Sequence, residues 1–348
     1  ITQYANDGYP YLLGVGNIVP DNTDLFWTDS GNFDTTFAGG SGTESDPYLI
    51  STARQLAGLA YLTNISTSTT YNGSNVYYLQ TADIDLSDYW WYAIGRSGSN
   101  YYFRGHYDGG GYTVSGIYTQ PGSSSTYSYQ GLFGYVRGTS TNRAEISNVG
   151  VINSNIQGYG YVAGIAGRAY YTNITNCYNT GIVTGSGESV GGVVGLNDSS
   201  ATVTNSYNTG TVTGTESVGG VVGYNINSVT NSYNTGSVTG SSQYIGGVVG
   251  RNTESVTNSY NTGSVTGTRS VGGVVGWNIS ASLVANSYNT GSVTGSDVRV
   301  GGVVGYNQLT TVLYCYYGGG CPSSVGGIDG ADVDGQAEYL GTITTDAK

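Results

Sequence analysis

Residues 205–223 read Asn-Ser-Tyr-Asn-Thr-Gly-Thr-Val-Thr-Gly-Thr-Glu-Ser-Val-Gly-Gly-Val-Val-Gly, and both halves of this stretch recur along the chain. The first half, Asn-(Ser/Cys)-Tyr-Asn-Thr-Gly, returns at intervals of 26–29 residues. Its tyrosines are Tyr178, Tyr207, Tyr233, Tyr260 and Tyr288. The second half, Val/Ile-Gly-Gly-Val-Val-Gly, returns with its first glycine at Gly191, Gly219, Gly246, Gly272 and Gly301. So short and regular a period indicates stacked copies of one small structural unit.

The repeat varies in length at only two places, and these locate its corners. Seven steps separate each repeat tyrosine from the glycine that ends Gly-x-Val-Thr-Gly, as between Tyr178 and Gly185. Insertions fall in the polar stretches before and after the glycine block, where surface corners tolerate them. Each repeat is therefore predicted to contain about three short strands, one tight corner at Asn-Thr-Gly and two adjustable corners.

The composition of the repeats favours strands over helices. Valine, threonine and tyrosine are abundant, no repeat shows a 3.6-residue apolar period, and glycine inside a helix costs about 0.5–1 kcal/mol. The predicted fold class is all-β, a right-handed parallel β-solenoid with about three strands per ~27-residue coil. Like residues of successive coils should then stack into ladders of tyrosines, corner asparagines and inward valines.

The chain is predicted to have four parts. They are an N-terminal extension, a helical cap with irregular first coils, the regular coils, and a C-terminal coil or cap, over residues 1–36, 37–128, 129–317 and 318–348. A short capping helix is predicted over 52–63, because Thr52-Ala-Arg-Gln55 is a capping-box pattern followed by leucines at helical spacing. This helix should cover the first coil, whose sheet edge would otherwise be exposed.

Several phrases of the first half occur in the order found in a known family. They are Gly40–Thr52, Gln80–Leu86, Ala93–Gly95 and Phe103–Gly116, followed by the glycine blocks Gly131–Gly134 and Gly192–Gly195. Over roughly residues 37–345 the chain resembles bacterial surface proteins with GLUG-motif repeats. The resemblance implies a secreted or surface-attached, adhesin-like β-helix, and it implies no single catalytic activity. The chain departs from the family pattern in its tyrosine richness, its single lysine and residues 1–36.

Charge and hydropathy argue against two classes of partner. Asp and Glu outnumber Lys and Arg by 22 to 10, which gives a net charge of −12, so no nucleic-acid partner is expected. No run of 18 apolar residues occurs, so no membrane insertion is expected. The start Ile1-Thr2-Gln3 fits a removed secretory signal or a fragment of a longer chain. We therefore expect a secreted protein of the extracellular space or cell surface.

A short apolar stretch precedes the repeats. Its apolar residues are Tyr11, Leu12, Leu13, Val15, Ile18 and Val19. The stretch either packs along its own solenoid or is donated as a strand to a neighbouring subunit, whose exposed edge it would complete. The second alternative predicts homo-oligomers that grow through strand-donating or end-to-end contacts.

The sequence offers few groups for catalysis, and no catalytic residue is predicted. His106 is the only histidine and has no evident nucleophile partner. Asp83 and Asp85 are candidate carboxylates, but their spacing puts both on one face of one strand. Glycoside hydrolysis needs two carboxylates at a set separation across a groove. We therefore predict a protein that is not an enzyme, with a polysaccharide-degrading β-helix as the alternative.

One acidic loop resembles part of a calcium site. Asp329, Asp332 and Asp334 supply oxygens, but Gly330 and Gly341 stand where a complete EF-hand loop has acids. Calcium is the one cofactor considered, and a solvated turn is the alternative.

The three cysteines allow one disulfide. Cys315 and Cys321 are close in sequence and could pair in an oxidising compartment, or both could stay as free thiols. Cys177 would be left over in either case.

Repeated hydroxyls and aromatics could form a binding surface. Thr211-Val-Thr213 and its equivalents would present two outward hydroxyls per coil, as ice-binding solenoids do. Tyr224, Trp277 and Tyr306 follow the glycine block and should point outward, where aromatic rings could bind glycans. The sequence thus predicts an extracellular structural protein, either a self-assembling filament subunit or an adhesin stalk. A polysaccharide-binding β-helix and an ice-binding solenoid are the alternatives.

Overall fold

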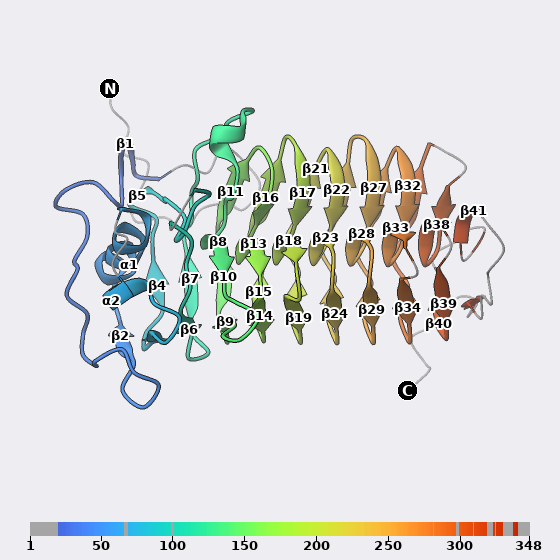
Figure 1. Ribbon diagram of the computed structural model, residues 1–348. Helices are drawn as coiled ribbons and strands as arrows, with labels where there is room; N and C mark the ends of the chain where they lie inside the picture. Colours follow the sequence, from blue (N-terminus) through green and yellow to red (C-terminus); the bar gives the residue numbers. More distant parts are fainter. Residues whose placement is uncertain are drawn as a thin grey trace, which may run out of the picture.

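The chain winds into a rod in which successive coils follow one another along the axis (Figure 1). This computed structural model describes residues 20–65, 69–98, 101–280, 282–296, 299–308, 310–318, 323, 325–329 and 337–339. Strands of neighbouring coils pair in parallel throughout the solenoid, as β20 pairs with β25. The prediction of an all-β parallel solenoid is therefore confirmed.

Each regular coil contributes one strand to each of five sheets, which we number I to V in chain order. Sheet I contains β2 (Tyr48–Ile50), β3 (Tyr77–Gln80), β6 (His106–Asp108), β9 (Ala144–Ser147), β14 (Thr172–Thr175), β19 (Thr202–Thr204), β24 (Ser228–Thr230), β29 (Ser255–Thr257), β34 (Leu283–Ala285) and β39 (Thr311–Leu313). Sheet II contains β4 (Ile84–Asp85), β7 (Thr113–Ser115), β10 (Gly150–Ile152), β15 (Tyr178–Asn179), β20 (Tyr207–Asn208), β25 (Tyr233–Asn234), β30 (Tyr260–Asn261), β35 (Tyr288–Asn289), β40 (Cys315–Tyr317) and β42 (Ala337–Tyr339).

The other three sheets are shorter. Sheet III contains β11 (Asn155–Gly158), β16 (Ile182–Gly185), β21 (Val212–Gly214), β26 (Val238–Gly240), β31 (Val265–Gly267) and β36 (Val293–Gly295). Sheet IV contains β12 (Val162–Ala163), β17 (Glu188–Gly191), β22 (Glu216–Gly219), β27 (Gln243–Gly246), β32 (Arg269–Gly272) and β37 (Val300–Gly301). Sheet V contains β8 (Phe133–Arg137), β13 (Ala166–Tyr170), β18 (Val194–Asp198), β23 (Val222–Asn225), β28 (Val249–Asn252), β33 (Val275–Ile279), β38 (Val304–Gln308) and β41 (Val325–Asp329).

A regular coil thus has five short strands where the sequence predicted about three. The difference arises at residues with a left-handed backbone, which bend the chain between strands. Asn205 between β19 and β20 has a φ of 51°, and its equivalents Asn231 and Asn258 have 52°. Asparagine tolerates this region better than most residues. A second such residue, for example Ser217 with a φ of 54°, lies inside the four middle strands of sheet IV, β17, β22, β27 and β32.

The core consists of apolar residues that occupy the same position in each coil. Val203, Val229 and Val256 are neighbours in the register of sheet I, and all three are fully buried. The glycine pair lets neighbouring coils approach each other. A Cβ on Gly220 would lie 2.1 Å from the carbonyl oxygen of Gly247 and 2.3 Å from Cγ of Asn234, so only glycine fits there.

The N-terminal end of the rod carries α1 (Ala53–Ile65) and the short α2 (Thr69–Asn72) (Figure 1). The predicted helix over 52–63 is confirmed, with an end two residues later. The Thr52 hydroxyl accepts from the Gln55 amide at 3.3 Å, and the Gln55 side chain accepts from the Ser51 amide at 2.9 Å. These bonds satisfy donors at the start of the helix as a capping box does.

The described part of the N-terminal extension packs on the first coils of its own chain. Strand β1 (Asn22–Phe26) pairs in parallel with β5 (Tyr89–Trp90). The indole of Trp27 is buried and donates to the carbonyl of Leu86 at 2.8 Å. A 3₁₀ turn, η1 (Ser125–Tyr127), completes the described elements.

Candidate functional site

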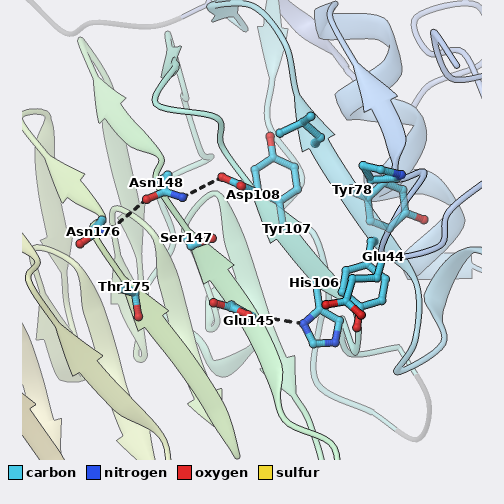
Figure 2. A pocket seen from close by; sticks show the side chains of 13 residues that line it. Glu44, Tyr78, His106, Tyr107, Asp108, Glu145, Ser147, Asn148, Thr175 and Asn176 are labelled. Carbon is cyan, nitrogen blue, oxygen red and sulfur yellow. Dashed lines mark hydrogen bonds and ion pairs between the residues drawn. The ribbon is translucent and has the colours of Figure 1, made fainter. Parts of the chain in front are cut away.

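The outer face of sheet I is hollowed near the N-terminal end of the rod (Figure 2). The hollow has a volume of about 430 Å³ and extends over β3, β6, β9 and β14, with Glu44 and Pro47 at one side. Its residues come from the irregular first coils, where repeat side chains give way to a histidine and carboxylates. The groove is therefore the first candidate for a site of chemistry.

His106 is held on three sides at the floor of this groove. Its ring stacks on that of Tyr77, with centroids 4.3 Å apart and 6° between the planes. Nε2 lies 3.2 Å from the carbonyl oxygen of Ser74, and Nδ1 lies 3.6 Å from Oε2 of Glu145 (Figure 2). The interaction with His106 lowers the pKa of Glu145 below its ordinary value. Nε2 thus contacts a backbone carbonyl, and Nδ1 faces the Glu145 carboxylate at ion-pair distance without a hydrogen bond.

Asp108 and Asp83, two other carboxylates of the region, are engaged in turns. Asp108 accepts from the amide of Gly110 and from the side chain of Asn148, each at 2.9 Å. Asp83 accepts from the backbone and side chain of Thr113 at 2.8 and 2.9 Å, and these bonds lower its pKa.

Asp85 likewise caps a turn, since it accepts from the amide of Ser87 at 3.0 Å. Asp83 and Asp85 are both exposed, and neither lies among the groove's lining residues. The structure therefore does not bring these two candidate carboxylates together across a groove. Among the described residues, no cluster of histidine, cysteine and carboxylate side chains could hold a metal ion.

A tyrosine ladder runs along the outer face of sheet II. Its members are Tyr178, Tyr207, Tyr233, Tyr260 and Tyr288. Successive ring centroids lie 4.8–4.9 Å apart and the planes are within 3° of parallel. Partial burial, together with the neighbouring phenols, raises the pKa of Tyr178, Tyr233 and Tyr288.

Two asparagine ladders lie inside the coils beside these strands. Asn179, Asn208, Asn234, Asn261 and Asn289 are fully buried, and each side-chain amide donates to the next side-chain oxygen at 2.7–2.8 Å. The second ladder consists of Asn197, Asn225, Asn252, Asn278 and Asn307, with bonds of 2.6–3.0 Å. The sequence reasoning anticipated the first ladder but missed the second, although Val-Val-Gly-x-Asn recurs in every repeat.

The outer face of sheet V carries a row of aromatic and arginine side chains, which we call the sheet V stripe. In register order the row is Tyr135, Arg168, Leu196, Tyr224, Arg251, Trp277 and Tyr306. The Arg251 guanidinium lies 4.5 Å from the ring centroid of Tyr224 and 4.8 Å from that of Trp277. Tyr224 and Trp277 are partly exposed, whereas Tyr306 is only 7% exposed, and the prediction that all three point outward overlooked the arginines beside them.

Hydroxyl rows follow two other faces. On sheet III, Thr213, Thr239 and Thr266 are neighbours in register, next to inward valines. On sheet I, Thr204, Thr230 and Thr257 form a second row that the sequence reasoning did not identify. Both rows are the ordinary outward positions of half-buried strands.

Several predicted site residues lie outside the described residues. These are Tyr11, Leu12, Leu13, Val15, Ile18 and Val19 of the proposed assembly strand, Asp332 and Asp334 of the calcium loop, and Cys321. For Asp329 only the backbone, at the end of β41, is described. The assembly strand and the calcium site therefore remain predictions, whereas Cys315 is a free thiol in the structure, against the predicted disulfide.

Cys177 and Cys315 are buried free thiols that occupy one position of the repeat. The next residues, Tyr178 and Tyr316, lie in the register of sheet II, and so does Tyr207, which follows Ser206. The two cysteines therefore stand where that repeat has Ser206. Sγ of Cys315 lies 3.2 Å from the carbonyl oxygen of Leu313, and Sγ of Cys177 lies 3.3 Å from that of Thr175. Burial raises the pKa of Cys177 to about 12 and that of Cys315 to about 11.

The coils match a known repeat. The GLUG motif matches residues 158–184, 186–213, 214–239 and 241–266. The chain thus carries four GLUG motifs between residues 158 and 266. Each full GLUG match runs through sheets IV, V, I and II to sheet III, so the motif corresponds to one coil.

One curated relative and one solved structure extend the comparison. A protein of Evansella cellulosilytica, provisionally named a Gly-rich membrane protein, is 34% identical over 108 residues, which cover 29% of this chain and 11% of that protein. The chain thus matches only a small part of that relative's length. A crystal structure from Bacteroides ovatus, provisionally named an immunoglobulin A1 protease, has a TM-score of 0.62 and 21% identity, over 84% of this chain and 87% of that one. This likeness shows a shared fold. In the described part of the chain, no helix has the length and apolar character needed to cross a bilayer.

Proposed function

We propose that this protein is a non-catalytic structural component of the cell exterior, either a subunit of a self-assembling filament or an adhesin stalk. The observation that carries the proposal is the continuity of the ladders along the rod. Tyrosine stacking, two buried amide chains and an apolar core repeat from coil to coil over β15 to β35. These ladder and core contacts are thus made again from one coil to the next, which suits a stiff extended element.

The geometry of the groove supports a non-catalytic role. His106 and Glu145 face each other, and Asp108 is engaged by Gly110 and Asn148. General acid–base catalysis would need a group positioned to exchange a proton with a bound substrate. These carboxylates instead stabilise the irregular first coils.

Filament growth would use the ends of the solenoid. The last coil of a solenoid presents unpaired backbone groups, which are a template for another strand. We propose that the segment containing Tyr11 to Val19 supplies that strand to a neighbouring subunit. The name of the Evansella relative, a membrane protein, is in keeping with a location at the cell surface.

Electron microscopy of the purified protein tests this proposal. We expect negatively stained rods that join end to end into filaments as the protein concentration rises. A variant lacking residues 1–19 should give single rods of unchanged width. Its circular dichroism spectrum controls for folding, since β1 and the coils remain intact.

Two outcomes would contradict the proposal. Single rods at every concentration, with no attachment to surfaces, would remove both the filament and the stalk. Release of reducing sugar from polysaccharide by the wild type but not by Glu145→Gln would favour the enzyme alternative.

A further inference from the structure

The arginines of this acidic protein are unevenly distributed. The chain has a net charge of −12 and only ten Lys and Arg residues in total. Four of them stack on aromatic rings of the outer face of sheet V or its border, namely Arg137, Arg168, Arg251 and Arg299. Four of the ten cationic side chains thus lie on or beside one long face of a chain whose net charge is negative.

Arg251 is the most distinctive of these residues. Its guanidinium lies between the rings of Tyr224 and Trp277, which belong to the coils before and after it. It makes no ion pair with any described carboxylate, and its buried Nε has no hydrogen-bond acceptor among the described residues. A guanidinium that lies between two rings keeps its in-plane N–H donors for another ligand, and its planar fork matches a carboxylate.

The surroundings of Arg251 strengthen the positive field. The Tyr244 ring stacks on Trp277 with centroids 4.4 Å apart, and Arg251, Arg269 and Arg299 all lie close enough to affect its pKa. Glu216 is the one described carboxylate that affects the pKa of Tyr244, and it acts in the direction opposite to the arginines. Cations therefore outnumber anions around this end of the stripe among the described residues.

A second cationic cluster lies on the same face near the N-terminal end. Arg137 lies 4.9 Å from the ring centroid of Tyr102 and 5.0 Å from that of Tyr170. A hollow of about 260 Å³ opens beside them, lined in part by Arg104, Gly138 and Tyr171. Strand β8, which carries Arg137, is four coil steps from β28, which carries Arg251, or about 19 Å at ~4.8 Å per step.

The face between the two clusters is nearly neutral. Arg168 forms an ion pair with Asp198, and Leu196 and Tyr224 follow it in the row. A ligand that contacts both clusters must therefore be long and must carry well-spaced negative charges. Duplex DNA carries a charge about every 1.7 Å and would be repelled by the rest of this acidic rod.

We propose that the sheet V stripe binds a linear acidic polysaccharide that lies along the solenoid axis. Its carboxylates bind Arg137 and Arg251, and its sugar rings lie against the aromatic side chains between them. This binding surface is independent of whether the rod forms filaments, so it goes beyond the proposed structural role.

Binding to acidic and neutral glycans tests the proposal on the full chain. We expect hyaluronan, with one carboxylate per two sugars, and polygalacturonate to bind in isothermal titration at low salt and to weaken as salt screens the charges. Arg251→Gln should lower the affinity about tenfold, as expected for the loss of a charge-assisted hydrogen bond. Arg251→Lys should be intermediate, because it keeps the charge and loses the planar fork.

Arg54→Gln is the matched control. Arg54 forms an ion pair with Asp34 away from the sheet V stripe. Its replacement also removes one positive charge but should leave the affinity for acidic glycans unchanged. Equal losses in Arg54→Gln and Arg251→Gln would overturn the proposal in favour of a general charge effect. It would also be overturned by equally tight binding of neutral dextran, by preferential binding of single-stranded DNA, or by no binding of either acidic glycan.

Discussion

The buried amide ladder makes a quantitative prediction at Asn234. Its side-chain amide donates to Oδ1 of Asn261 at 2.8 Å and to the carbonyl of Gly236 at 2.7 Å, and its own Oδ1 accepts from Asn208 at 2.8 Å. Asn234→Ala therefore removes the donor to two buried oxygens. Asn208 keeps one of its two bonds, to Gly210.

The magnitude follows from these partners. A buried polar group left without its partner costs about 1–3 kcal/mol, so two orphaned oxygens and one weakened donor should destabilise the fold by about 3–5 kcal/mol. The perturbation should be local as well as global, because each coil contacts only its neighbours. Amides of β20, β25 and β30 should therefore lose more protection from hydrogen exchange than those of β10.

Urea titration and native-state hydrogen exchange measure the two effects. Thr235→Ala is the matched control, since Thr235 is the next residue after Asn234 and its side chain is exposed. It should change the free energy of unfolding by less than about 0.5 kcal/mol. A loss below about 1 kcal/mol for Asn234→Ala, or a loss equal to that of Thr235→Ala, would refute the view that the amide ladder holds neighbouring coils together.

Three further predictions concern titratable groups. The pKa of Tyr233 is raised above 10, so the folded protein holds this proton more tightly than the unfolded chain does. The contribution of Tyr233 to the free energy of unfolding should therefore be complete below pH 10 and should fall as the pH rises through the raised value. Thermal melts of Tyr233→Phe should show a smaller fall. His106 lowers the pKa of Glu145, so the stabilisation from this pair is complete above the ordinary value of 4.5 and is lost as the pH falls through the lowered value. The difference in melting temperature between wild type and Glu145→Gln should therefore shrink on acidification, and a constant difference would contradict this. The Cys177 thiol, with a pKa of about 12, should react with a thiol reagent near pH 8 only as fast as the protein unfolds, whereas immediate labelling in the native state would show that it is accessible.

The repeat itself made most of the fold predictable. Recurrence of Asn-Ser-Tyr-Asn-Thr-Gly required equivalent residues to be stacked, and the tyrosine rings of Tyr207 and Tyr233 do lie 4.8 Å apart. The capping box at Thr52 and Gln55 located α1, because those contacts are local in sequence. Local signals and exact repetition are what a single sequence reveals best.

The features that were missed depend on backbone angles and on contacts between coils. Asn205 has a left-handed backbone, which separates two strands that the sequence suggested as one. The sequence alone does not distinguish an asparagine in this conformation from one with an extended backbone. Arg251 and Trp277 occupy the same position in successive repeats but are different residue types. No single residue type recurs at that position, so the repeat sequence does not reveal the stripe. Position in the register, rather than residue identity, brings these side chains together.

The groove around His106 illustrates the same limit. His106, Tyr77 and Glu145 are neighbours in register on three successive coils of sheet I, although they are separated by about 30 to 40 residues each. The irregular lengths of these first coils concealed that register. The sequence therefore identified the histidine but could not supply its partners.

Engineered disulfides test the stacking of coils most directly. Thr213 and Thr239 are register partners on sheet III, with Cα atoms expected about 4.8 Å apart, and Thr266 is one coil further. The double variant Thr213→Cys/Thr239→Cys should oxidise to a disulfide with the fold retained, whereas Thr213→Cys/Thr266→Cys, at roughly twice the separation, should not. Ready oxidation of the second pair in the monomer, or failure of the first in a folded protein, would contradict the arrangement from which every ladder described above follows.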